Sequence, residues 1–291
     1  MKRMECLFMA LFAVLSCQVS SGQKYVTTQA DKDVAVKVMT GMAAEYDRPI
    51  SQLMVMAAES MIGTEYVGGT LDEDPLNEQL TLYLTKTDCI IFVETCLNLA
   101  RAVKDKNGGI PSFDDFAARV AQTRYRCKPP YTYGDRIHYT TEWIRRQEGT
   151  LKDITMELGG EVYDHPINFM TKHNNLYKQL ADADSIPRAA LDLKKVGECE
   201  EALNREPMTF IPKGKLAAAM KGIKNGDIIC YVSNVEGLDI AHVAIAYVEN
   251  GRVGFIHASQ ADGKVEIDKR TIDEYVLPRS NLSGIKVVRP L

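Results

Sequence analysis

The chain has 291 residues, of which 45% are hydrophobic and 25% are charged, and its formal net charge is -4 at pH 7. A chain of this length forms one or two domains and can bury a sizeable core. This net negative charge does not favour binding to nucleic acid. Beyond the N-terminus, no apolar run is long enough to predict a transmembrane helix.

The first 22 residues have the pattern of a secretory signal peptide. Lys2 and Arg3 precede an apolar run over residues 7–15, and small residues follow up to Gly22. We therefore exclude residues 1–22 from the fold and expect an exported, periplasmic protein. The remaining chain, 23–291, is expected to form a single domain.

The positions of the cysteines bear on a lipid anchor, on free thiols and on zinc binding. The segment that ends at Cys17 is similar to a weak bacterial lipobox, which gives an alternative in which the protein is a lipoprotein anchored through this residue. Five cysteines lie outside the signal region, and an odd number in an exported chain leaves at least one thiol free. No CxxC pair occurs, so no zinc site is predicted.

The N-terminal half begins with two predicted helices, over residues 31–46 and 50–62, in which apolar residues recur at helical spacing. A glycine-rich loop follows at 63–69. Tyr66 lies in this loop between glycines, which is typical of a place where backbone must approach another group closely.

The stretch around Cys89 carries the first chemical signal. Apolar residues recur at helical spacing from Cys89 to Val103, which predicts an amphipathic helix with Thr87 or Asp88 as its N-cap. A thiol in the first turn of a helix lies at the positive end of the helix dipole, which favours the nucleophilic thiolate. Cys89 is therefore a candidate nucleophile that needs a base from elsewhere in the chain.

An aromatic and basic segment follows a further predicted helix at 113–124. It includes Arg136, His138, Tyr139 and Trp143, which is the only tryptophan of the chain. The segment is either a structural connection with solvated arginines or a wall for a polar ligand that bears carboxylates or sugars. We favour the wall, because the tryptophan and several tyrosines fall together here.

The candidate base comes from a predicted β-hairpin near the C-terminus. The Asn-Gly pair at 250–251 lies between two β-rich runs and predicts a two-residue turn in which Glu249 pairs with Arg252. This register makes His242 and His257 diagonal neighbours on one face of the sheet. One histidine can then act as a base that the other orients, whereas a slip of one residue would separate them.

Further strands are predicted at 227–232, 264–269 and 284–289. Together with the hairpin they form an antiparallel sheet that can curl into a partial barrel. Helices first and strands later predict an α+β fold, with a mainly helical insertion at about 105–224.

The ordered motifs resemble those of the NlpC/P60 cysteine peptidases. The similar parts are the tyrosine and double glycine of 63–69, the Asp88-Cys89 pair, and the strands at 241–245 and 255–258 that carry the two histidines. The resemblance implies a papain-like core. It also implies that Cys89 is the nucleophile, His242 the general base and His257 its orienting residue, and that Tyr66 helps to stabilise the oxyanion.

The DUF1460 branch of that superfamily resembles the chain more closely. The similar segments are 136–139 with Trp143, 168–173, and 237–239. About twenty residues separate Gly69 from Cys89, and two isoleucines follow the cysteine where Ser-Gly is usual; both features fit this branch better than the general peptidases.

The DUF1460 resemblance implies an N-acetylmuramoyl-L-alanine amidase of small muropeptides, with anhydro-muropeptides from wall turnover as the expected form. The expected substrate contacts are Arg136, His138, Tyr139, Trp143 and Asp239. Peptidoglycan fragments are then the partners, a monomer is expected, and no metal or cofactor is required. Two alternatives stay open: a γ-D-glutamyl-diamino acid endopeptidase with the same triad, and a non-catalytic wall-binding module.

Overall fold

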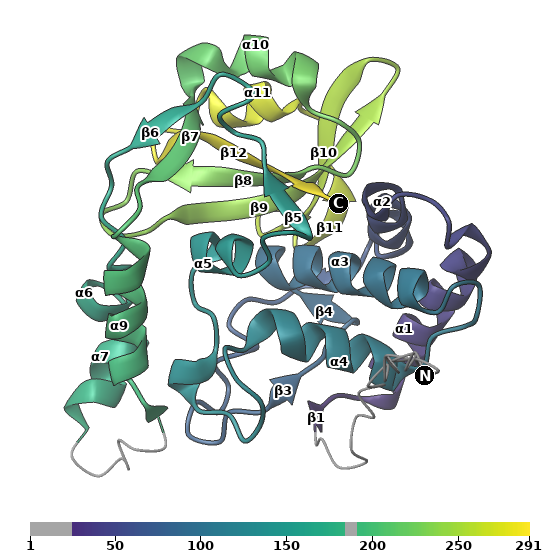
Figure 1. Ribbon diagram of the computed structural model, residues 1–291, viewed down its shortest axis with the longest axis horizontal. Helices are drawn as coiled ribbons and strands as arrows, with labels where there is room; N and C mark the ends of the chain where they lie inside the picture. Colours follow the sequence, from purple (N-terminus) through teal and green to yellow (C-terminus); the bar gives the residue numbers. More distant parts are fainter. Residues whose placement is uncertain (1–24, 184–190) are drawn as a thin grey trace, which may run out of the picture.

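The structure is a computed structural model that describes residues 25–183 and 191–291 (Figure 1). The expected signal peptide and Cys17 lie outside the described residues. Within them, no helix is both long and apolar enough to cross a membrane.

A central helix, α3, organises the N-terminal half. Nearly every side chain of α3 from Ile91 to Val103 is buried, because α1, α2 and α4 pack around it and its remaining face contacts the sheet. The four helices, with the short η1 after α1, are α1 (Gln29–Met42), η1 (Ala43–Glu45), α2 (Ile50–Ser60), α3 (Cys89–Asp105) and α4 (Phe113–Arg124). The sequence predicted all four within a few residues.

Ten strands form the main sheet, in the order β4-β2-β11-β10-β9-β8-β12-β7-β6, with β5 paired to β12. These strands are β2 (Glu65–Tyr66), β4 (Lys86–Thr87), β5 (Leu151–Asp153), β6 (Glu161–Tyr163), β7 (Met208–Pro212), β8 (Ile228–Ser233), β9 (Ile240–Glu249), β10 (Arg252–Ser259), β11 (Lys264–Ile267) and β12 (Leu282–Pro290). The C-terminal strands β8–β12 pair antiparallel as predicted, but β2 and β4 are parallel, so the sheet is mixed rather than wholly antiparallel. A separate parallel pair joins β1 (Tyr25–Val26) to β3 (Leu80–Thr81).

The segment expected to be a helical insertion supplies both helices and strands. Strands β5, β6 and β7 all come from it and join the main sheet. Besides α4, the helices in its described part are η2 (Tyr133–Asp135), α5 (Thr140–Arg145), α6 (Phe169–Lys172), α7 (Asn175–Asp182), α9 (Lys194–Leu203), η3 (Lys213–Lys215), α10 (Leu216–Ala219) and η4 (Met220–Gly222). Residues 173–174 separate α6 from α7. The single domain and its boundaries stay predictions.

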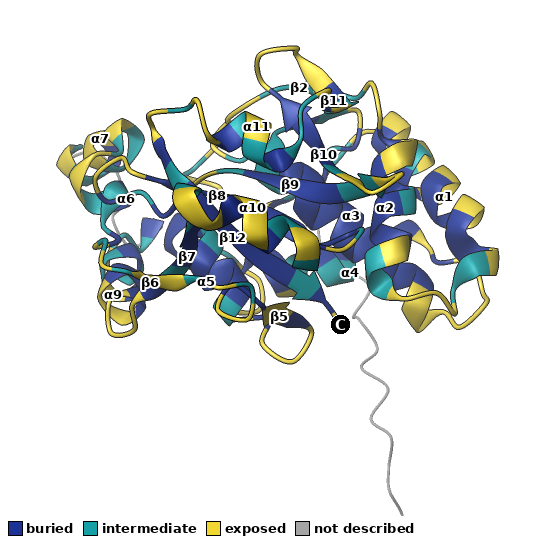
Figure 2. Ribbon diagram, turned by 90° about the horizontal axis from the view of Figure 1, so that it is seen from above, coloured by how far each residue is buried: buried dark blue, intermediate teal, exposed yellow. Residues whose placement is uncertain are grey.

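Both faces of the sheet are covered. In Figure 1, α3, α4 and α5 lie on one side of the sheet, and α10 and α11 (Ile272–Val276) lie on the other. Along β8, Ile228 and Cys230 belong to the core under the N-terminal helices, whereas Ile229 and Tyr231 face the core under α10 and α11. Figure 2 shows the resulting buried centre at β8 and β9, with exposed residues on the outer helices, the turns and the edge strands.

The turn that leads into β8 offers a test of this packing. Gly226 has a positive φ of 83°, and a Cβ atom there would lie 2.2 Å from the carbonyl oxygen of Ser51 on α2. Gly251 has a similar φ of 79° with nothing within 4 Å of its Cβ position. We expect both alanine variants to lose about 1–2 kcal/mol from backbone strain. Gly226→Ala should lose about 1–3 kcal/mol more, because α2 and the sheet must separate.

Urea unfolding of Gly226→Ala and of the matched control Gly251→Ala measures this difference in the free energy of unfolding. Equal losses in the two variants would contradict the close contact between α2 and the turn before β8.

Candidate active site

The β9–β10 hairpin has the predicted register. Asn250 and Gly251 both have positive φ, and Glu249 pairs with Arg252, with the ladder continuing to Ile245 opposite Ile256. The predicted proximity of the two histidines follows from this register. Nε2 of His242 lies 2.8 Å from Nδ1 of His257, with the two rings nearly perpendicular.

A β-bulge adjoins His242. On β9, His242 pairs with Tyr231 and Ile240 pairs with Val232, so the pairing skips Ala241. Bulges bend a strand and redirect the next side chain, and they are frequent beside active sites. Aromatic rings then fix the imidazole in place, since the Tyr231 ring stacks on His242 at 5.4 Å between centroids.

Cys89 is the first residue of α3, as predicted. The Asp88 side chain caps the helix by accepting a hydrogen bond of 2.9 Å from the Ile91 N–H. Helix α3 contacts both β9 and β10, and Cys89 and His242 line the same two cavities. The structure therefore brings the candidate nucleophile and the candidate base to one place.

The pKa of the thiol differs from the sequence-based expectation. Burial, followed by the nearby Asp88 carboxylate, raises the pKa of Cys89 to about 12, although backbone N–H groups at the helix start act in the opposite direction. Desolvation thus outweighs the helix dipole, and Cys89 rests as a thiol. Burial also lowers the pKa of His242 to about 3, with His257 adding to the effect, so the imidazole rests in its neutral, proton-accepting form.

The sequence analysis missed Asp268. Its Oδ2 lies 3.3 Å from Nε2 of His257, and both side chains are buried. Arg270 holds this carboxylate through its backbone N–H and its guanidinium, at 2.6–2.8 Å. Strand β11 pairs with β10 so that Glu266 is opposite His257, which makes Asp268 its diagonal neighbour on one face. Extending the hairpin register by one strand could have found it.

Glu266 completes a small acidic group beside His257. Ligand atoms of His257, Glu266 and Asp268 lie within 4.8 Å of one another, which is close enough for a cation. Both oxygens of Asp268, however, already accept hydrogen bonds from Arg270. Burial lowers the pKa of His257 to about 4, so its ring is neutral, and the contacts present fit a carboxylate that orients this ring better than a metal centre.

The first cavity beside Cys89, which we call the α5 cavity, has a volume of about 300 Å³. It contains every residue that the sequence predicted as a substrate contact, namely Arg136, His138, Tyr139, Trp143 and Asp239, together with Cys89 and His242. The structure thus places the aromatic and basic segment against the candidate nucleophile.

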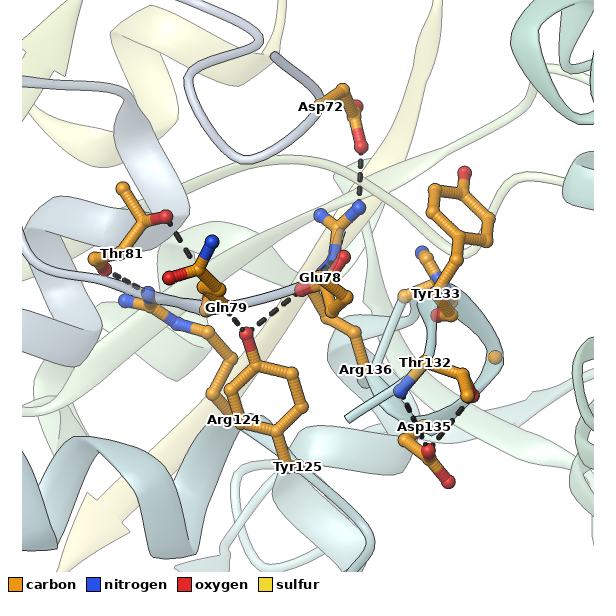
Figure 3. A network of polar contacts seen from close by, with 12 residues as sticks. Asp72, Glu78, Gln79, Thr81, Arg124, Tyr125, Thr132, Tyr133, Asp135 and Arg136 are labelled. Atoms are coloured by element: carbon orange, nitrogen blue, oxygen red, sulfur yellow. Dashed lines mark hydrogen bonds and ion pairs between the residues drawn. The ribbon is translucent and has the colours of Figure 1, made fainter. Parts of the chain in front are cut away.

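Most polar groups of this wall already have protein partners. The Arg136 guanidinium pairs with Asp72 and lies 3.2 Å from Glu78, as the network in Figure 3 shows. The Tyr139 hydroxyl donates to Glu200 at 2.6 Å, and Asp239 accepts from a backbone N–H at 2.7 Å.

Two further wall residues contribute ring surfaces. Nε2 of His138 lies 2.9 Å from the carbonyl oxygen of Tyr133, and burial, followed by the Arg136 charge, holds the pKa of this histidine well below its usual range. The indole N–H of Trp143 is buried without a partner among the described residues. The wall is therefore rigid, and its arginine charge is already neutralised. Substrate contact by these residues stays a prediction.

Tyr66 lies in the second cavity, which we call the α11 cavity and which has a volume of about 360 Å³. Burial, followed by the charges of Cys89 and Asp88, raises the pKa of Tyr66 to about 12, so its hydroxyl remains a hydrogen-bond donor. This position agrees with the predicted role beside the reacting carbonyl, which itself stays a prediction.

Comparison with known proteins gives the family of this chain. The family model described as N-acetylmuramoyl-L-alanine amidase-like matches residues 56–284. The chain belongs to this family. Membership indicates a hydrolase that acts on an amide and a substrate related to peptidoglycan. Among curated proteins, none matches the sequence.

Solved structures with the same fold come from several bacteria. An N-acetylmuramoyl-L-alanine amidase from Bacteroides uniformis is 28% identical with a TM-score of 0.70, and the match covers 83% of this chain and 99% of that chain. A Bacteroides fragilis protein with a suggested xylanase activity is 30% identical with a TM-score of 0.67, over 80% and 98% of the two chains. A DUF1460 protein from Legionella pneumophila is 20% identical with a TM-score of 0.66, over 90% and 95%, and shows the shared fold alone. The wider NlpC/P60 and papain-like assignment stays a prediction.

A buried ion pair under the α5 cavity gives a test of the wall. Arg124 donates to Oε2 of Glu94 at 2.6 and 2.9 Å, and both side chains are 5% exposed. Arg124→Met leaves the Glu94 carboxylate buried and uncompensated, so we expect a loss of about 3–5 kcal/mol in the free energy of unfolding. Chemical denaturation measures this loss.

The matched control for this test is the double variant Glu94→Gln/Arg124→Met, which removes both charges together. Its free energy of unfolding should recover much of the loss. If the single and double variants were equally unstable, the penalty would come from packing and not from an unpaired charge.

Proposed function

We propose that this protein is a cysteine-dependent N-acetylmuramoyl-L-alanine amidase. It hydrolyses the amide bond between the lactyl group of muramic acid and L-alanine in small muropeptides, including anhydro-muropeptides. The observation that carries the proposal is the contact of His242 with His257 at 2.8 Å, made beside Cys89 in a chain of the amidase-like family.

The geometry supports a nucleophilic mechanism. Since His257 occupies Nε2 of His242, Nδ1 is the nitrogen that remains to take the Cys89 proton. The sulfur attacks the lactyl carbonyl carbon, and the oxyanion is stabilised by the Cys89 backbone N–H at the helix start and by the Tyr66 hydroxyl. Protonated His242 gives its proton to the leaving alanine amine as the C–N bond breaks. Water, deprotonated by His242, then hydrolyses the thioester and regenerates the thiol.

Asp268 selects the correct tautomers for this scheme. If Nε2 of His257 carries the proton and faces Asp268, Nδ1 of His257 is an acceptor. His242 must then donate from Nε2, which leaves a lone pair on Nδ1 for the Cys89 proton. Reversal of the hydrogen bond between the two histidines would place a proton on Nδ1 of His242 and block the base.

The proposal includes where the enzyme works. The signal-like pattern of residues 1–22 favours export to the periplasm, with Cys17 as a possible site of lipid attachment. The expected monomer belongs to the same proposal. The rigid α5 cavity, with its aromatic and paired polar groups, suits a sugar and its acetamido groups.

The substrate assay uses purified protein and a defined anhydro-disaccharide tetrapeptide. We expect release of an intact peptide that begins with L-alanine, together with free disaccharide, and no cleavage by Cys89→Ala. Mass spectrometry of the products measures the bond that is broken. Cys96→Ala, which removes a thiol buried within the core, is the matched control and should stay active when folded.

The products also separate the alternatives. Cleavage inside the peptide would move the enzyme to the γ-D-glutamyl endopeptidase function. Binding of the wall fragment without any turnover would support a non-catalytic module, and equal turnover by Cys89→Ala would remove Cys89 from the mechanism.

Asp268→Asn tests the tautomer selection. The amide can donate to Nε2 of His257 and so favour the reversed arrangement, and we expect kcat to fall by roughly 10²–10⁴ with little change in KM, by analogy with the buried aspartate of serine proteases. Steady-state kinetics measures both constants, and thermal melting reports whether the fold is kept. Asp262→Asn, at an exposed carboxylate in the turn between β10 and β11, is the control. A normal kcat in Asp268→Asn would exclude this role.

A further inference from the structure

Two cavities meet at the candidate nucleophile. The α5 cavity and the α11 cavity share only Cys89, Ala241 and His242 among their lining residues. A substrate whose scissile bond lies at Cys89 therefore places one half in each cavity. Which half enters which cavity is a question of charge.

The arginines of the α5 cavity are already neutralised. Arg136 pairs with Asp72 and Glu78, and Arg124 pairs with Glu94. Asp88 and Asp239 also line this cavity, and burial raises the pKa of each. An additional carboxylate there would find no free cation among the lining residues and would have like charges nearby.

Arg279, in the α11 cavity, has no carboxylate partner among the described residues. Its guanidinium stacks on the Tyr275 ring at 3.5 Å from the centroid and donates one hydrogen bond to the Tyr275 carbonyl oxygen. No carboxylate among the described residues forms an ion pair with it, whereas the neighbouring Arg270 is held by Asp268. Arg279 thus keeps most of its donors available in a half-buried cavity.

The position of Arg279 is fixed relative to the base. The Tyr275 ring lies near both residues, with its centroid 3.5 Å from the Arg279 guanidinium and 6.1 Å from the centroid of the His242 imidazole. A residue of extended peptide spans at most about 3.3–3.6 Å, so a group one residue beyond the leaving alanine comes within reach of the guanidinium.

The two halves of a muramoyl peptide also differ in charge, and the difference is complementary to that between the two cavities. The carboxyl group of the muramoyl half is consumed in the scissile amide, which leaves a neutral sugar. The leaving peptide carries the free carboxylates. Charge complementarity therefore assigns the sugar to the α5 cavity and the peptide to the α11 cavity.

We propose that Arg279 binds the α-carboxylate of the residue that follows L-alanine in the leaving peptide, and so makes the enzyme selective for stems in which this carboxylate is free rather than amidated. A planar guanidinium suits bidentate contact with a carboxylate. The inference rests on the proposed amidase function and deepens it, because it names the feature of the peptide that the site recognises.

The experiment compares two substrates that differ in one group: an anhydro-disaccharide carrying L-Ala-D-Glu, and the same compound carrying L-Ala-D-isoglutamine. We measure kcat/KM for both with the wild-type protein, with Arg279→Met, and with Arg205→Met, an exposed arginine outside both cavities. The wild type should prefer the free carboxylate by about 10–100-fold, the range expected for a charged hydrogen bond. Arg279→Met should bring the ratio near one, and Arg205→Met should keep it.

The outcomes separate the role of Arg279 from the amidase function. Cleavage of both substrates at equal rates by the wild type would overturn the role of Arg279 while the amidase function stands. An unchanged ratio of kcat/KM for the two substrates in Arg279→Met would also overturn the role of Arg279. Failure of the wild type to cleave either substrate would overturn this inference, and failure to cleave the tetrapeptide of the substrate assay as well would overturn the amidase function. The wild-type ratio requires no variant, so it holds even if Arg279→Met fails to fold.

Discussion

The register of the β9–β10 hairpin is the constraint on which the site depends. Asn250 and Gly251 adopt positive φ angles that close a two-residue turn, and every pairing along the two strands follows from it. A shift of one residue would turn His242 and His257 to opposite faces and leave Cys89 without a base. Because β10 lies between β9 and β11 and both faces of the sheet are covered, such a shift would also expose the core residues of the hairpin.

Much of this arrangement could be predicted from the sequence, because its determinants are local. The turn sets the histidine register, and the apolar spacing after Asp88 sets the start of α3. The family resemblance added the order of the motifs, and the structure gathers all five expected contact residues in one cavity.

Long-range contacts account for what the sequence did not predict. Asp268 reaches His257 only because β11 pairs with β10, and Arg136 loses its free charge to Asp72 and Glu78 from a loop more than fifty residues earlier. The pKa of Cys89 depends on how much protein covers the thiol, which no local pattern reports.

Burial gives the proposed catalytic groups complementary properties. A thiol with a raised pKa and an imidazole with a lowered pKa rest as a neutral pair rather than as a thiolate and an imidazolium. In the proposed mechanism, His242 is then a weak base for the first proton transfer but a strong acid toward the leaving amine. Asp268 offsets part of this imbalance, since its negative charge acts through His257 when His242 becomes an imidazolium.

In the proposed mechanism, a bound peptide can offset the remaining weakness of His242 as a base. Burial is the main cause of the low pKa of His242, but the charge of Arg279 also lowers it. A carboxylate that binds Arg279 cancels this charge at short range and favours the imidazolium. The base would then strengthen only when a peptide with a free carboxylate fills the α11 cavity. Recognition of the leaving group and activation of Cys89 would be coupled through one arginine, and the thiol would stay protonated in the absence of substrate.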